Sequence, residues 1–335
     1  MGDGSPDTSI GSPILIGQAT APAPRAAWWR WRPAWRFRAP AWTSSLQFHL
    51  VLLAVTVFST VAAGTGIASN YEAGRPAFSV DLSLALSRSI FQHPARLALG
   101  LPFACTLLAI LLAHELGHYL ACRYYHLRVS YPYFIPAPTL IGTMGAFIRI
   151  RSAILTRRML LDVAVAGPLA GFVLAVPALA WGVLHSRLAT GPTPADAITP
   201  GTPLGLILLA RWLRPGIHAG RLALTPVGLA GWVGLFVTAL NLLPMGQLDG
   251  GHILYAVLGR RHRVLSRGLS VALLPLGWYC WPGWYLWAAI LWLIGTGHPP
   301  VLFPADPLGR RRQVLAAVAA VIFVLCFMPT PFSVT

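Results

Sequence analysis

The segment His114-Glu115-Leu116-Gly117-His118 lies inside an apolar run that extends from about residue 97 to residue 125. On a helix, two histidines four residues apart project from the same face, one turn above the other. Both imidazoles can therefore reach one Zn²⁺ ion at about 2.0–2.1 Å. Glu115 stands where such motifs place the general base that activates water. The segment predicts a catalytic zinc site on a helix.

The apolar surroundings give this short motif its weight. The sequence contains only two glutamates, Glu72 and Glu115, and LLAILLA and YLA flank the second one closely. An ionised side chain at the centre of a membrane helix costs about 2.5–3.5 kcal/mol even on the insertion scale, so such residues mark functional sites. The alternative is a cluster of His and Glu at a helix end, paired with backbone or water.

Composition indicates a membrane protein. The chain has 335 residues, of which 56% are hydrophobic and 10% are charged, against about 25% charged in soluble domains. The formal net charge is +16, and all basic residues are arginines. The arginines cluster beside apolar runs, as the positive-inside rule describes, and not on a soluble basic face. We therefore expect a lipid bilayer as the partner and no nucleic acid. The four cysteines lie in apolar segments without CxxC pairing, which is typical of buried thiols.

The pattern of apolar runs predicts an all-α polytopic membrane protein with about six transmembrane helices, five or seven being the alternatives. The expected spans are 46–68, 97–125, 160–185, 222–243, 269–295 and 314–328. The fifth, interrupted at Trp281-Pro282-Gly283, is either one bent span or a short hairpin. The run at 204–213 is too short to cross and is predicted to be re-entrant or interfacial. Residues 45–332 form a single transmembrane domain.

The N-terminal residues 1–44 differ from the rest. They hold no long apolar run and are predicted to form a disordered tail. The end of this tail carries five tryptophans and five arginines over residues 25–42, a composition that suits a membrane interface and a cytoplasmic N-terminus. Residues 69–95 are predicted to be a non-cytoplasmic loop.

Residues 129–152 are apolar but cannot form a helix. Pro132, Pro136 and Pro138 fall within seven positions, and Gly142 and Gly145 follow. The segment predicts a short re-entrant loop or β-hairpin, placed against the metal site because non-helical backbone at membrane depth needs a protein or wet environment. A surface hairpin on the cytoplasmic side is the alternative.

The third span carries small residues and one acid. Gly167, Ala170 and Gly171 allow close helix contact, and Pro168 is expected to kink the span unless neighbours bind the freed carbonyl. Asp162 lies near the start of the span beside arginines. We expect Asp162 to be structural and not a ligand.

A catalytic zinc usually takes three protein ligands. The extended pattern HExxHxxGxxH fails, because Ala121 and Tyr124 stand at its Gly and His positions, and no glutamate follows Glu115. The aspartates downstream are at positions 162, 196, 249 and 306. Only Asp249 is expected at the end of a span, and Gly250-Gly251 would let its backbone pass close to another helix. Asp249 is the predicted third ligand.

Two motifs together resemble the site-2 protease family of intramembrane zinc metalloproteases. HELGH is followed downstream by NLLPMGQLDGGH at 241–252. The matching positions are His114, Glu115, His118, Asn241, Pro244, Asp249 and Gly250. FIPAP, GTMGAFIRIRS and AVAGPLAGF are similar to the bacterial and plastid-type branch, and no PDZ or CBS-type domain is expected. The resemblance covers about residues 97–256. It implies that the two histidines and the aspartate bind zinc and that the glutamate activates water.

The expected function is hydrolysis of peptide bonds in or near transmembrane segments, in a bacterial cell membrane with the site toward its cytoplasmic half. Asn241 is expected to donate to an oxyanion or hold the substrate backbone, the alternative being a hydrogen bond between helices. His252 is either an outer partner of Asp249 or a spare ligand. An edge strand near 142–147 is suited to holding an unwound substrate. A metal-binding transporter or sensor and a proteolytically inactive homologue are the alternatives, and Glu115 argues against both.

Overall fold

A computed structural model describes residues 41–78, 94–189, 197–299, 301–304 and 307–334. The predicted tail at 1–44 therefore lies almost wholly outside the described residues, and so does most of the loop predicted at 69–95. The rest of the chain, from Ala41 onward, forms one compact unit.

Most of the described chain is helical. The longer helices are α1 (Leu46–Glu72), α3 (Leu101–Tyr124), α4 (Arg157–Leu184), α5 (Leu204–Leu213), α6 (Pro226–Asn241), α7 (Asp249–Leu258), α8 (His262–Tyr279), α9 (Gly283–Ile294) and α10 (Arg310–Cys326). Three helical segments in the described residues are long and apolar enough to cross a membrane, namely 46–72, 95–124 and 157–184. They coincide with the first three predicted spans. The fourth and sixth predicted spans form α6 and α10, whose 16 and 17 residues fall below the length of about 20 that a bilayer core requires.

The aromatic stretch at 269–295 is a helical hairpin. α8 ends at Tyr279, the chain turns at Trp281-Pro282, and α9 begins at Gly283 and packs against α8. Proline fits this position because its fixed φ and missing N–H suit the start of a helix. Of the two alternatives, the structure therefore has the hairpin and not a bent span.

The proline-rich segment after α3 also forms a hairpin. β1 (Tyr133–Pro136) pairs antiparallel with β2 (Thr143–Phe147), with Tyr133 opposite Phe147. Gly142, at the turn, has φ +78°, a conformation that costs glycine little. Its carbonyl accepts a hydrogen bond of 2.6 Å from the Ser59 hydroxyl, which fixes the turn to α1.

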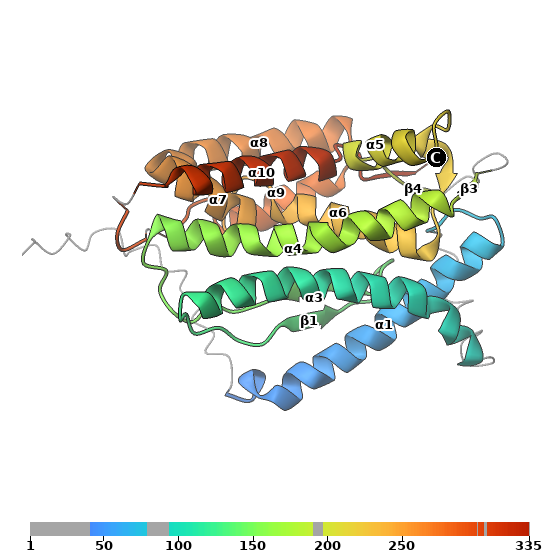
Figure 1. The fold of residues 1–335 in the computed structure, drawn as a ribbon, viewed down its shortest axis with the longest axis horizontal. Coiled ribbons are helices and arrows are strands. Elements are labelled where there is room, and N and C mark those ends of the chain that lie inside the picture. The colour runs from blue at the N-terminus through green and yellow to red at the C-terminus, as the bar shows by residue number, and fades with distance from the viewer. Residues whose placement is uncertain (1–40, 79–93, 190–196, 300, 305–306, 335) are drawn as a thin grey trace, which may run out of the picture. The chain divides into compact units, whose positions relative to one another are not determined.

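Three helices form the centre of the fold. α3 packs against α4, and α4 packs against α6 (Figure 1). The helices approach closely because glycines lie at the contacts. A Cβ on Gly117 of α3 would lie 2.3 Å from the Ala166 carbonyl oxygen of α4, and one on Gly182 of α4 would lie 2.1 Å from the Gly228 Cα of α6. α4 is continuous through both of its prolines. The predicted close contact of the third span is confirmed, and it presses α4 against the face of α3 that carries HELGH.

Two further strand pairs and α5 lie outside this centre, and short 3-10 helices at Ala41–Ser44, Pro94–Gly100, Ala219–Arg221 and Gly259–Arg261 connect the longer elements. β3 (Arg187–Leu188) pairs with β5 (Leu222–Ala223), and β4 (Ile198–Pro200) pairs with β6 (Phe332–Val334). α5 packs against α4 and α10. The two strand pairs and α5 lie at the end of α4 opposite to its N-terminus (Figure 1), so they take no part in the site below.

Candidate metal and active site

The HELGH segment lies in the second half of α3 with its three functional side chains inside the protein. His114, Glu115 and His118 are each at most 8% exposed. Leu116 and Leu120 are exposed on the opposite face of the helix. The 3.6-residue period thus turns the polar side chains toward α4 and the leucines outward. The expectation that both histidines share one face is confirmed.

α4 fixes the orientation of the histidines through its backbone and its small residues. The His118 Nδ1–H donates to the Val163 carbonyl at 2.8 Å, which leaves Nε2 as the free ligand nitrogen. A Cβ on Gly167 would lie 2.1 Å from His118 Nε2, and one on Gly171 would lie 3.3 Å from the His114 side chain. The glycines of AVAGPLAG therefore make room for the imidazoles.

The sequence suggested that Asp249 lies at the end of a span. In the structure Asp249 is instead the first residue of the short helix α7. α6 ends at Asn241, and the chain reverses through residues 242–248 before α7 starts. A Cβ on Gly250 would lie 2.0 Å from the Leu242 carbonyl oxygen. The predicted close approach at Gly250-Gly251 is therefore present, but its partner is this reversing segment and not another helix.

The three predicted ligands meet. The distance from His114 Nε2 to His118 Nε2 is 3.1 Å, and each of these nitrogens lies 3.3 Å from Asp249 Oδ2. They form the one group of at least three His, Cys, Asp or Glu donors within 4.8 Å of one another in the described residues. Ligands at about 2.0–2.1 Å in tetrahedral geometry are about 3.3 Å apart. The triangle therefore fits a Zn²⁺ ion, and its borderline N₂O donor set suits that metal.

A cavity of about 260 Å³ opens onto this triangle. Glu115 lines it beside the ligands, and Ala146 and Phe147 of β2 line it from the hairpin. The prediction that the hairpin lies against the metal site agrees with this lining. Asn241, at the end of α6, also lines the cavity, and its amide nitrogen lies 3.3 Å from His114 Nε2.

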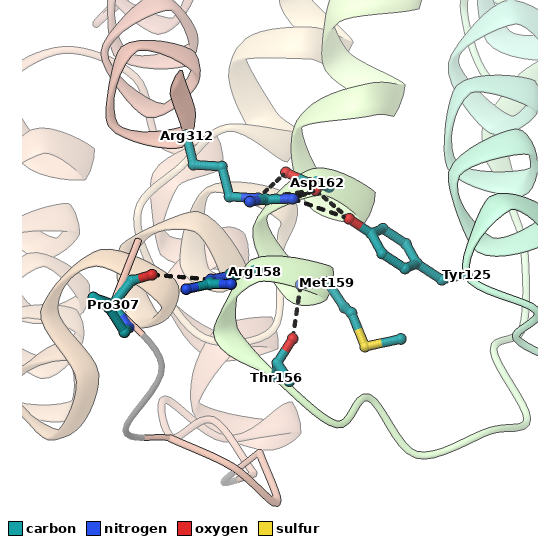
Figure 2. Close-up of polar contacts among 7 residues, drawn as sticks. All are labelled: Tyr125, Thr156, Arg158, Met159, Asp162, Pro307 and Arg312. Carbon is teal, nitrogen blue, oxygen red and sulfur yellow. Dashed lines mark hydrogen bonds and ion pairs between the residues drawn. The ribbon is translucent and has the colours of Figure 1, made fainter. Parts of the chain in front are cut away.

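Asp162 is a structural residue, as its arginine-rich surroundings suggested. The Arg312 guanidinium donates to both of its carboxylate oxygens, with Nε to Oδ1 at 3.0 Å and Nη2 to Oδ2 at 2.7 Å. The Tyr125 hydroxyl also donates to Oδ2. Figure 2 shows this cluster beside the start of α4, where Thr156 caps the amide of Met159. The carboxylate next to Val163 thus ties α4 to α10 and to the end of α3.

Sequence reasoning did not find two features of this site. The acceptor for His118 is a backbone carbonyl, that of Val163, and carbonyls carry no sequence signal. His298 lies in the segment after α9, yet its Nε2 is 2.7 Å from His252 Nδ1. The two residues are 46 positions apart, so their spacing gives no sign of the contact. The only signal in the sequence is that His298 is a histidine next to an apolar segment.

The buried histidines of this triangle, with a glutamate directly after the first, fit the HExxH pattern of zinc metallopeptidases, and here the pattern lies on a helix long and apolar enough to cross a membrane. The chain belongs to peptidase family M50, whose sequence model matches residues 102–277. This confirms the resemblance to the site-2 protease family.

Curated plant proteins are similar over most of the chain. "Probable zinc metalloprotease EGY1, chloroplastic" of Arabidopsis thaliana is 35% identical over 69% of this chain and 43% of its own length. The protein of the same name from Oryza sativa subsp. japonica is 31% identical over 97% of this chain and 54% of its own. "Probable zinc metalloprotease EGY2, chloroplastic" of Arabidopsis thaliana is 28% identical over 88% and 50%. The chain thus spans about half the length of these relatives.

Proposed function

We propose that this chain is an intramembrane zinc metalloendopeptidase that cleaves peptide bonds in or near transmembrane segments of other membrane proteins. The observation that carries the proposal is the triangle of His114, His118 and Asp249 with Glu115 beside it, buried and open to one cavity. Membership in peptidase family M50 and relatives named zinc metalloproteases support it.

Each residue of the site has a role in this reaction. Zinc, when held by the triangle, supplies a Lewis acid that activates water and polarises the scissile carbonyl. Glu115 takes the proton from the attacking water and passes it to the leaving amine. Asp249 contributes the one negative charge among the ligands, which offsets part of the metal charge in a region of low dielectric. His118 is kept in one tautomer by its bond to Val163.

Asn241 is suited to substrate contact. Its side-chain amide lies at the rim of the triangle and faces the cavity. An amide N–H in that position can donate to the oxygen that becomes negative in the transition state. While His114 Nε2 holds zinc it cannot accept from Asn241, so the Asn241 N–H, 3.3 Å away, is free to contact the bound peptide.

The substrate must be extended at the site, because the amides of a helix are already hydrogen-bonded and unavailable. β1 and β2 form a two-stranded sheet in the described chain, so one edge of β2 faces no strand there. An unwound substrate segment can add to that edge by backbone hydrogen bonds, with Phe147 at the cavity wall. This supports an extended segment as the form in which the substrate binds.

We propose that the site lies toward the cytoplasmic half of a bacterial cell membrane. Arginines at 123–158 and at 260–267 support this orientation. Arg157 of the first group donates to the carbonyls of Ala256 and Val257, just before the second group. Cysteines introduced at positions 128 and 151 should react with membrane-permeant but not with external reagents. Labelling by an external reagent would reverse the topology.

The function is tested on purified full-length chain in detergent micelles, with zinc content measured beside cleavage of a model transmembrane protein. We expect Glu115→Gln to keep zinc and to lose cleavage by about 10²–10⁴-fold, because the base is removed and the ligands remain. A wild-type chain that binds zinc and cleaves no such substrate would favour a transporter or sensor. Loss of zinc in Glu115→Gln would contradict the assigned role of the glutamate.

A further inference from the structure

Outside the zinc triangle, the cavity contains one imidazole that the reaction above does not use. His252, one turn after Asp249 on α7, lines the cavity. It does not belong to the group of metal donors that the described residues form. Its Nδ1 lies 2.7 Å from Nε2 of His298, and the His298 ring stacks on Tyr255 with 4.1 Å between ring centroids.

The direction of the hydrogen bond between the two histidines follows from a carbonyl. His298 Nδ1 lies 2.5 Å from the Pro299 carbonyl oxygen, which can only accept, so Nδ1 of His298 carries a proton. Burial, with His252 as a further cause, lowers the pKa of His298 to about 3, so this ring is neutral near pH 7. Its Nε2 is therefore an acceptor, and the Nδ1–H of His252 donates to it.

A neutral imidazole with its proton on Nδ1 has a lone pair on Nε2. Within the described chain, His252 Nε2 makes no hydrogen bond of its own. The hydrogen bond to His298 thus keeps the His252 ring in one tautomer. The free Nε2 of His252 is a hydrogen-bond acceptor at the wall of the cavity. Among the lining side chains outside the metal ligands and Glu115, Asn241 and Gln247 carry amide donors, whereas His252 carries only an acceptor on this side.

An unwound peptide brings backbone N–H groups into the cavity, and each one buried without an acceptor weakens binding. We propose that His252, fixed by His298, is a substrate-binding residue that accepts a hydrogen bond from a backbone N–H of the unwound substrate beside the scissile bond. This inference rests on the proposed function and assigns His298 as the positioning residue.

The test uses the zinc-loaded full chain in detergent micelles, in the Glu115→Gln background so that binding is read without cleavage. The probe is a synthetic leucine-rich transmembrane peptide with a central Asn-Pro break. His252→Asn keeps an amide where Nδ1 meets His298 and loses the cavity-facing nitrogen. His252→Gln keeps a polar atom at the position of Nε2. We expect binding to fall about tenfold in His252→Asn and to recover largely in His252→Gln, with zinc content unchanged in both.

A second set of probes identifies the partner. Successive amides around the break are replaced by esters, which keep the carbonyl and remove the N–H. One ester peptide lacks the N–H that His252 would accept. We expect this peptide to bind equally well to the chain with His252 and to His252→Asn. His298→Phe should weaken binding of the all-amide peptide a few-fold, because the His252 tautomer is no longer fixed. With Glu115 intact, His252→Asn should raise KM about tenfold and change kcat little.

Several results would overturn this assignment. The first is unchanged peptide binding in His252→Asn. The second is that each ester peptide loses as much affinity for the chain with His252 as for His252→Asn. The third is loss of zinc in His252→Asn, which would make His252 a ligand. The ester peptides test the wild-type ring as well, so poor folding of one variant does not remove the test. Failure of the proposed function looks different: peptide binding would respond to His252, but the wild-type chain would cleave nothing.

Discussion

Two aspartates lie near the N-terminal ends of neighbouring helices and have opposite surroundings. Asp162, in the second turn of α4, faces the guanidinium of Arg312 and the hydroxyl of Tyr125. Asp249, the first residue of α7, faces two imidazole nitrogens at 3.3 Å. Both carboxylates are less than a quarter exposed. One has its counter-charge built into the chain, whereas the other meets only groups that are neutral when they bind a metal.

This difference separates a structural carboxylate from a ligand. A partly buried charge requires an opposite charge and hydrogen bonds. Arg312 supplies them to Asp162, so a cation from solution would add little there. At Asp249 the opposite charge has to come from outside the chain, and the tetrahedral edge lengths of the triangle fit a divalent ion. The identical substitution at the two positions should therefore have different consequences.

The largest effect is expected for Asp249→Asn. The variant keeps the shape of the side chain and removes the charge that offsets Zn²⁺. Loss of a residue that only hydrogen-bonds to a metal ligand lowers metal affinity about 10–100-fold, and we expect a larger fall here because a ligand itself is changed. Peptide hydrolysis should be lost with it. Metal analysis after dialysis against a weak chelator measures the first effect. Asp162→Asn is the matched control, and it should keep one zinc per chain.

One outcome would change the ligand set. If Asp249→Asn kept its metal and activity while His252→Ala lost both, the site would contain three histidines. The position of His252, bonded through Nδ1 to His298 and outside the donor triangle, argues against that result.

The next effect concerns the glycine that faces His118. Gly167→Ala would place a methyl group 2.1 Å from the present position of His118 Nε2, so the imidazole or α4 must move. We expect zinc affinity to fall about 10–100-fold and the free energy of unfolding to fall by about 1–3 kcal/mol. Zinc titration and thermal unfolding in micelles measure these. Gly268→Ala, an exposed helical glycine with no atom within 4 Å of the new Cβ, should leave zinc binding unchanged.

The motif residues show how far the sequence predicts the site. The spacing of His114 and His118 determines their shared face once α3 is a helix, because the helical period alone places them. Asp249 could be predicted by elimination among the downstream acids. Its place at the start of a new helix could not be predicted from the sequence. A reversal over residues 242–248 followed by a new helix depends on contacts between Gly250 and Leu242, which are tertiary.

The fold divides in the same way. The first three predicted spans became α1, α3 and α4 as expected, since length and hydropathy suffice for such helices. The hairpin at 129–152 was predictable because prolines exclude a helix there. The break between α8 and α9 was left open, because Trp281-Pro282-Gly283 permits both a kink and a turn. Which one forms is decided by the packing of the two helices against each other.

A smaller effect is expected for Asp162→Asn. The amide still accepts one bond from Arg312 but loses the charge and the second acceptor, so the free energy of unfolding should fall by about 1–3 kcal/mol. Thermal unfolding of the zinc-loaded chain measures the change. A fall in zinc affinity as large as that of Asp249→Asn would mean that this carboxylate acts on the metal site directly, and the distinction between the two aspartates would be lost.

The smallest effect is expected for Tyr125→Phe, which removes one hydroxyl from the same cluster. The hydroxyl donates to Asp162 and accepts a longer hydrogen bond, of 3.3 Å, from Arg312 Nη2. Asp162 keeps its contacts with Arg312, so the free energy of unfolding should fall by only about 0.5–1.5 kcal/mol, with unchanged zinc content. Tyr124→Phe is the control, because Tyr124 is 76% exposed. In the Asp162→Asn background the cost of Tyr125→Phe should shrink, since residues in one hydrogen-bonded network are not additive. Equal costs in both backgrounds would show that the hydroxyl stabilises α3 by some contact other than the carboxylate.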